Sequence, residues 1–202
     1  MKPNLGSLTT LPKKGDEKFH SKEKNLGYAL KDFWTWSASD LMSNVTRGHL
    51  AEFIVAKAIG AVECVRNEWA TYDLTTPTGE KVEVKSAAYL QSWFQDDYST
   101  IQFNVEKTKE LDLKKGGYRG KPKRHADVYV FALLAHTDKP TVDPLNINQW
   151  EFYVLPTTAL NKRKRSQHSI TLKSLEDLSG GKVDYVQLAK KINSFKLRHR
   201  HA

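Results

Sequence analysis

KVEVK at residues 81–85 alternates charged and apolar residues, which is typical of a β-strand with one apolar and one charged face. Val82 and Val84 point to one side, toward a core. The other side carries three charged residues, Lys81, Glu83 and Lys85. The preceding TPTG at residues 76–79 is a turn sequence, so the chain before it should pair with this strand as a hairpin.

The hairpin places two carboxylates opposite each other. With a three-residue loop over 77–79, Asp73 pairs with Glu83. Opposed cross-strand residues have Cβ atoms about 4.5–5.5 Å apart, and like charges there are destabilising unless something neutralises them. Mg²⁺ takes carboxylate oxygens together with waters and substrate phosphates, so Asp73 and Glu83 predict a magnesium half-site. Lys85 leaves the strand on the same face as Glu83 and can reach a metal-side water; the alternative is an ordinary surface ion pair.

A helix precedes the hairpin and further strands follow it. TRGHLAEFIVAKAIG at 46–60 has apolar residues at helical spacing and ends at Gly60, with Glu52 at the edge of its buried face. Strands are expected within residues 99–106, 126–136 and 149–157, and a final helix within 185–197. The almost continuous apolar run in the second strand indicates burial on both faces, which predicts a mixed sheet.

Composition indicates a small, basic, single-domain protein. The chain has 202 residues, is 39% hydrophobic and carries a net charge of +9. We expect a flexible basic arm over residues 1–24 and one domain over 25–202. The lone Cys64 excludes an intramolecular disulfide and a cysteine zinc cluster. We found no signal-like segment and no run of about 18 apolar residues, so we expect a cytoplasmic protein without a membrane partner.

The positive charge favours a polyanionic partner such as DNA, because neutralised phosphates release counterions. Two basic segments are candidate phosphate contacts: a glycine-containing loop over 107–125 and the run at 162–165. Solvated charged faces are the alternative. The candidate nucleic-acid contacts are Gln91, Arg47, Lys121, Lys123, Arg124, Lys162, Arg163, Lys164 and Arg165. For Gln91, a merely polar position among core aromatics is an equal alternative.

These motifs together resemble the PD-(D/E)xK nuclease superfamily, also called restriction endonuclease-like, over about residues 47–135. The resemblance rests on GHLAE with Glu52, YDL with Asp73, and EVK with Glu83 and Lys85. It implies an α/β fold with an αβββαβ core, a mixed central sheet flanked by helices. It also implies Glu52, Asp73 and Glu83 as catalytic ligands of Mg²⁺, with Mn²⁺ as a substitute, and Lys85 as the residue that orients or deprotonates the attacking water. Tyr72 departs from the motif, in which proline precedes the aspartate.

The expected function is therefore metal-dependent hydrolysis of phosphodiester bonds in DNA by an endonuclease. Arg47, Gly48, Ala51 and Glu52 also look like the corresponding positions of archaeal Holliday-junction resolvases. Restriction, junction resolution and repair thus stay open, as does RNA as substrate, and a homodimer is one way to cut both strands. The alternative from another class is a non-catalytic nucleic-acid-binding or assembly protein with the same fold.

Overall fold

A four-stranded mixed sheet forms the centre of the computed structural model, which describes residues 5–6, 8–61, 65–112 and 116–195. The strand order is β3 (Leu74–Thr75), β4 (Lys81–Ala88), β8 (Val128–Leu134) and β9 (Trp150–Pro156). β4 and β8 run parallel, whereas the two outer pairs are antiparallel. The predicted mixed sheet is confirmed, and every residue of β8 is buried, as its apolar run indicated.

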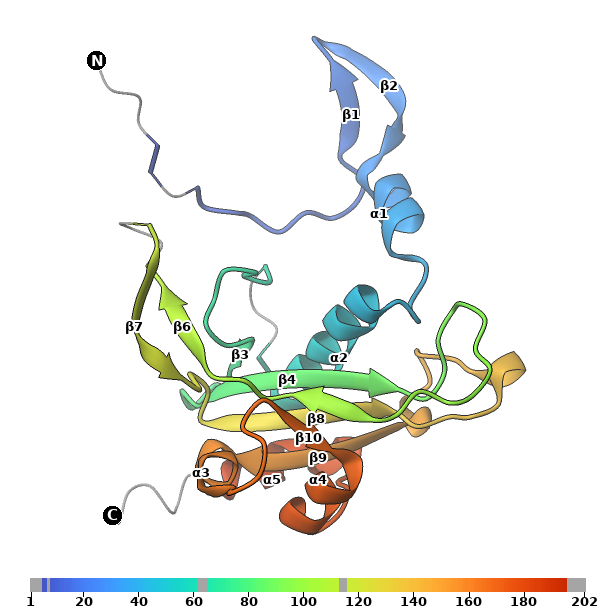
Figure 1. The fold of residues 1–202 in the computed structure, drawn as a ribbon. Helices are drawn as coiled ribbons and strands as arrows, with labels where there is room; N and C mark the ends of the chain where they lie inside the picture. The colour runs from blue at the N-terminus through green and yellow to red at the C-terminus, as the bar shows by residue number, and fades with distance from the viewer. Residues whose placement is uncertain (1–4, 7, 62–64, 113–115, 196–202) are drawn as a thin grey trace.

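Helices and short strands cover both faces of this sheet (Figure 1). On one face, α2 (Asn44–Ile59) and α5 (Leu188–Asn193) pack on Val82, Val84 and the alternate residues of β8 and β9. On the other face, residues of β5 (Gln102–Asn104), β10 (Ser169–Thr171), α3 (Thr157–Lys162) and α4 (Leu172–Ser179) close a second core. β4 therefore lies between two apolar layers at one end, and its charged residues occupy the other end.

The helix that carries Glu52 begins at Asn44, two residues before the predicted stretch, and ends at the predicted Gly60. The Ser43 side chain accepts the Thr46 N–H at 3.4 Å, which caps the first turn of α2. Gly60 follows the last turn with φ of 72°, a left-handed conformation that favours glycine, and its N–H donates to the carbonyls of the final turn.

The β3–β4 hairpin has the predicted register. Leu74 pairs with Val82 and Thr75 with Lys81, and the Thr76 N–H donates to the Glu80 carbonyl at 2.9 Å. Gly79 closes the turn with φ of 95°. Continuing this register by one residue brings Asp73 opposite Glu83, as the turn length predicts.

The connection from β4 to the parallel β8 differs from the expected core. The αβββαβ order implied a helix before the last strand, and the sequence predicted a basic loop at 107–125. β5 lies within the strand expected over 99–106, and the described residues that follow it form a hairpin of β6 (Thr108–Leu111) and β7 (Tyr118–Lys123) in place of a helix or a loop. Gly116 and Gly117 have φ of 72° and 82°, left-handed values that favour glycine, and they lie where the chain turns from β6 into β7.

The N-terminal arm also contains regular structure. β1 (Lys18–Ser21) and β2 (Lys24–Ala29) form a hairpin that leads into α1 (Leu30–Ala38), and Figure 1 shows this unit standing away from the main sheet. Three 3-10 turns complete the fold: η1 (Lys139–Thr141), η2 (Ile147–Gln149) and η3 (Tyr185–Gln187). Cys64 and the middle of the basic segment, residues 113–115, lie outside the described residues. Within the described ranges, no helix is long and apolar enough to cross a bilayer.

Candidate active site

Asp73 lies at the edge of the sheet, directly before the first residue of β3. Its N–H donates to the Val82 carbonyl at 3.1 Å, and its Oδ2 accepts the Val84 N–H at 2.7 Å. Because β3 has only two residues, the Asp73 carboxylate takes the place of a strand backbone beside β4. The short strand and its turn thus determine the position of the Asp73 carboxylate beside β4.

Glu83 and Lys85 leave β4 on the same face, as strand alternation predicts. The Lys85 Nζ lies 2.6 Å from the Glu83 Oε1, and both side chains are partly buried. This is the ion pair expected of an E-x-K strand. Here it stands next to a second carboxylate, Asp73, and the Lys85 charge offsets only part of the repulsion between them.

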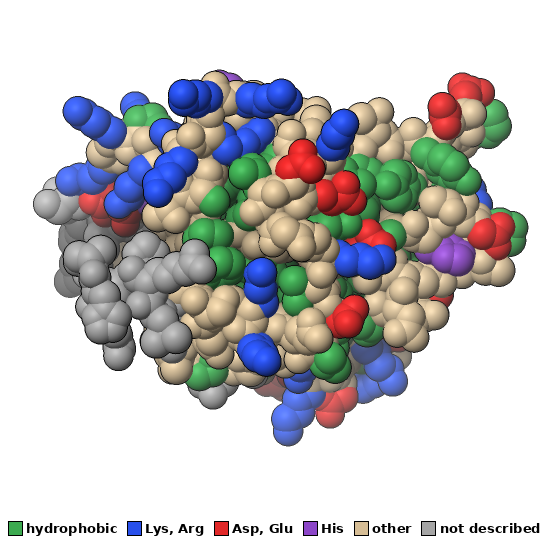
Figure 2. Space-filling view, turned by 90° about the horizontal axis from the view of Figure 1, so that it is seen from below, with side chains coloured by type: hydrophobic (Ala, Val, Ile, Leu, Met, Phe, Trp, Pro, Cys, Tyr) green, Lys and Arg blue, Asp and Glu red, His purple; other side chains and the backbone are tan. Residues whose placement is uncertain are grey.

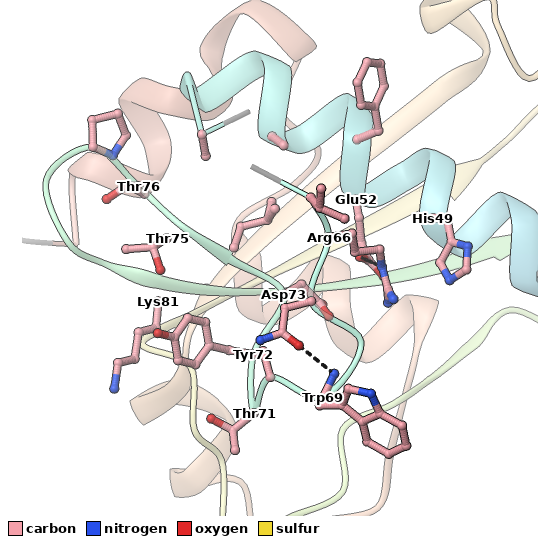
Figure 3. A pocket seen from close by; sticks show the side chains of 18 of the residues that line it. His49, Glu52, Arg66, Trp69, Thr71, Tyr72, Asp73, Thr75, Thr76 and Lys81 are labelled. Carbon is pink, nitrogen blue, oxygen red and sulfur yellow. Dashed lines mark hydrogen bonds and ion pairs between the residues drawn. The ribbon is translucent and has the colours of Figure 1, made fainter. Parts of the chain in front are cut away.

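Glu52 approaches the same edge from α2. Its carboxylate accepts two hydrogen bonds from Arg66, from Nε at 2.5 Å and from Nη2 at 2.9 Å. Figure 3 shows Glu52 and Arg66 facing each other close to Asp73. Sequence analysis missed Arg66, because it lies in an irregular segment without periodicity and meets Glu52 through the packing of that segment on α2.

The clustering of carboxylates changes the chemistry of Asp73. Burial, together with the negative charges of Glu83 and then Glu52, raises the pKa of Asp73 to about 7. The hydrogen bond from Val84 and the charge of Lys85 act in the opposite direction. Asp73 therefore keeps its proton to a higher pH than an ordinary aspartate, and a nearby cation would favour its ionised form.

The donor set at this edge suits a hard divalent cation, since it consists of carboxylate oxygens. Within the described part of the chain, no three His, Cys, Asp or Glu side chains already form a metal-binding cluster. Asp73 and Glu83 supply the paired carboxylates, while both oxygens of Glu52 are engaged by Arg66. Magnesium commonly uses one or two carboxylates and completes its shell with waters and phosphates, so the pair is sufficient.

A cavity with a volume of about 910 Å³ opens next to the carboxylates of Glu52 and Asp73. Glu52, Arg66 and Asp73 line its acidic end, and aromatic residues of the segment before β3, including Trp69 and Tyr72, line another part (Figure 3). The end of β6 also borders it. The hairpin that replaced the predicted loop is thus part of the wall of the site.

Comparison with protein families agrees with this arrangement. The profile described as bacteriophage T4 endonuclease IV matches residues 3–174, a range that includes the four predicted catalytic residues and the whole four-stranded sheet. The chain belongs to the bacteriophage T4 endonuclease IV family. It is a DNA endonuclease, and the predicted activity is confirmed to that extent. A comparison with curated proteins returned no match.

Two predicted groups of nucleic-acid contacts of this endonuclease lie on the surface. Lys121 and Lys123 are exposed on β7, whose hairpin partner borders the cavity. The basic run at 162–165 lies at the end of α3 and beyond; Lys162, Lys164 and Arg165 are exposed, and Arg163 donates to the Ser169 carbonyl. Figure 2 views the molecule from below Figure 1. It shows Lys and Arg side chains gathered at the end of the molecule where α3 lies in Figure 1. None of these six residues lines the cavity.

Three other predicted contacts lie inside the endonuclease. Arg124 is 7% exposed and donates to the Val105 and Gln167 carbonyls and to side chains of the α3 region. Arg47 is 3% exposed and donates to the Met42 carbonyl, to the Asn44 side chain and to the Gln91 side chain, which is itself 6% exposed. The prediction that these residues bind phosphate is corrected by their burial. They connect loops to helices, and burial lowers the pKa of both guanidinium groups.

Proposed function

We propose that this endonuclease hydrolyses DNA phosphodiester bonds in a metal-dependent reaction at a site of PD-(D/E)xK type. The proposal includes a restriction endonuclease-like core built on α2, β3 and β4. It rests on one observation: Asp73, Glu83 and Lys85 converge at the open edge of β4, beside the helix that bears Glu52. The order of these residues along the chain agrees with the order in the motif.

Asp73 and Glu83 would hold Mg²⁺, or Mn²⁺ as its substitute. The fit is electrostatic, because a divalent charge between the two carboxylates removes the repulsion that raises the pKa of Asp73. When bound, such a cation supplies a water of lowered pKa and stabilises charge on the phosphate oxygens. Glu52 would add a third carboxylate after its release from Arg66.

Lys85 orients the attacking water and stabilises the negative charge that develops on the phosphate. Its ammonium group is a donor, so it holds a water through the oxygen lone pair and leaves the water protons free to depart. The ion pair with Glu83 holds this group at the edge of β4, at 2.6 Å from one carboxylate oxygen. The exposed Lys121 and Lys123 on the neighbouring hairpin would contact the DNA backbone.

A cleavage experiment tests the proposal. Wild type, Glu83→Gln and the control Asp127→Asn are incubated with plasmid, linear duplex, single-stranded and four-way-junction DNA, each with Mg²⁺, Mn²⁺ or EDTA. Asp127 is an exposed carboxylate that accepts the Lys81 N–H at the start of β4 and is not one of the proposed metal ligands, so the control changes a nearby carboxylate outside the proposed site. We expect cleavage by wild type and control with metal, and none by Glu83→Gln or in EDTA.

Cleavage in EDTA would refute the metal requirement, and undiminished cleavage by Glu83→Gln would refute the site. The cleaved DNA form separates the biological alternatives, because a restriction enzyme cuts at fixed duplex sites and a resolvase prefers four-way junctions. The ratio of nicked to linear plasmid products reports whether both strands are cut together, as a homodimer would do.

A further inference from the structure

Arg66 lies at the acidic end of the cavity, where its guanidinium places a positive charge beside the carboxylates. Its guanidinium makes a two-pronged contact with both oxygens of Glu52, and its charge also interacts with Asp73. The Arg66 side chain is 38% exposed, although its partner Glu52 is only 12% exposed. The guanidinium thus faces the cavity while it holds a nearly buried carboxylate.

The contact between Arg66 and Glu52 cannot persist if Glu52 becomes a metal ligand. Both carboxylate oxygens point to the guanidinium, and a divalent cation in the same place would repel it. The two positive groups therefore compete for Glu52. A guanidinium that leaves a carboxylate fits a phosphate equally well, because both anions present two oxygens to its planar fork.

Other cations near the cavity have different partners. Lys85 is paired with Glu83, and the Lys81 Nζ lies 5.1 Å from the centre of the Tyr72 ring. Arg66 lines the cavity together with Glu52 and Asp73, and Figure 3 shows it beside Glu52. A phosphate that enters beside the carboxylates would meet this guanidinium first.

We propose that Arg66 is a catalytic phosphate-binding residue that exchanges Glu52 for a DNA phosphate when the metal loads. This inference rests on the metal site of the proposed function. In the free protein Arg66 pairs with Glu52 beside Asp73. With a metal bound, Glu52 would serve as a ligand and Arg66 would bind a nonbridging phosphate oxygen. Arg66 thereby couples occupation of the metal site to capture of the substrate.

The exchange is tested first by metal binding without DNA. The affinity for Mn²⁺ is measured by electron paramagnetic resonance for wild type, Arg66→Gln and Arg119→Gln. Arg119 is the matched control, since it makes a 2.7 Å ion pair with Asp112 on the β6–β7 hairpin, away from Glu52. We expect Arg66→Gln to bind Mn²⁺ several-fold more tightly than wild type, and Arg119→Gln to bind it equally well.

The second readout is the affinity for DNA. A fluorescent oligonucleotide of the form that the enzyme cleaves is titrated in Ca²⁺, with gels to verify that it stays intact. We expect Arg66→Gln to bind about tenfold more weakly, as for loss of one charge-assisted hydrogen bond. The slope of log affinity against log salt concentration should become shallower by the amount expected for one lost phosphate contact. Arg66→Met, which also removes the charge and keeps an unbranched side chain, serves if Arg66→Gln does not fold.

The outcomes separate the two proposals. If either readout of the Arg66 variant equals wild type, the exchange is overturned. If Glu83→Gln also binds Mn²⁺ like wild type, the metal site itself is refuted. If Glu83→Gln loses Mn²⁺ while Arg66→Gln behaves as wild type, the metal site stands and the role of Arg66 falls.

Discussion

Asp73→Asn should stabilise the metal-free protein at neutral and alkaline pH. The substitution removes the charge that burial, Glu83 and Glu52 disfavour, while the amide oxygen can still accept the Val84 N–H. The pKa of Asp73 rises from an ordinary 3.8 to about 7 on folding. A difference of about three pKa units corresponds to up to about 4 kcal/mol, at about 1.36 kcal/mol per unit.

The sign of the pH dependence follows from proton binding. Between pH 4 and 7 the folded protein holds a proton on Asp73 that the unfolded chain has released, so the stability of wild type falls as pH rises. Below pH 4 both states are protonated and the effect of Asp73 vanishes. At pH 8 Asp73→Asn should therefore exceed wild type by up to about 4 kcal/mol, or roughly 10 °C in melting temperature for a chain of this size.

Urea unfolding in EDTA from pH 4 to 8.5 measures this difference directly. Asp127→Asn, which changes an exposed carboxylate that also accepts a backbone N–H, should follow the wild-type profile. Addition of Mg²⁺ at pH 8 should stabilise wild type more than Asp73→Asn, because the ligand binds the folded site. Parallel profiles for wild type and Asp73→Asn would refute the electrostatic account of this carboxylate.

Further predictions concern chemistry, DNA binding and packing. Lys85→Met should lower kcat by about 10²- to 10⁴-fold with Mn²⁺ affinity retained, as single-turnover kinetics and metal titration would show; an equal loss of Mn²⁺ would make Lys85 structural. The double substitution of Lys121 and Lys123 by Gln should weaken DNA binding and reduce its salt slope by about two contacts; an unchanged slope would exclude β7 from the interface. Arg124→Met should destabilise the fold by about 3 kcal/mol, because buried acceptors lose their donor; a change below about 0.5 kcal/mol in urea unfolding would contradict its packing role.

Local patterns were sufficient to predict the elements that carry the paired carboxylates. Strand alternation in residues 81–85 and the turn at 76–79 determined which side chains share a face and which residues are opposed, because both depend on near neighbours in the chain. The helix that carries Glu52 was predictable for the same reason, since helical spacing and Gly60 mark its course and its end.

Contacts between distant segments decided the rest. The pairing of Arg66 with Glu52, the burial of Arg47 and Arg124, and the parallel pairing of β4 with β8 join residues far apart in sequence. A charged residue has the same identity on the surface and in the interior, so a family resemblance placed Arg47, and a basic segment placed Arg124, among the DNA contacts although both are buried. The raised pKa of Asp73 likewise exists only in the folded protein, because it takes tertiary packing to exclude water and bring three carboxylates to one sheet edge.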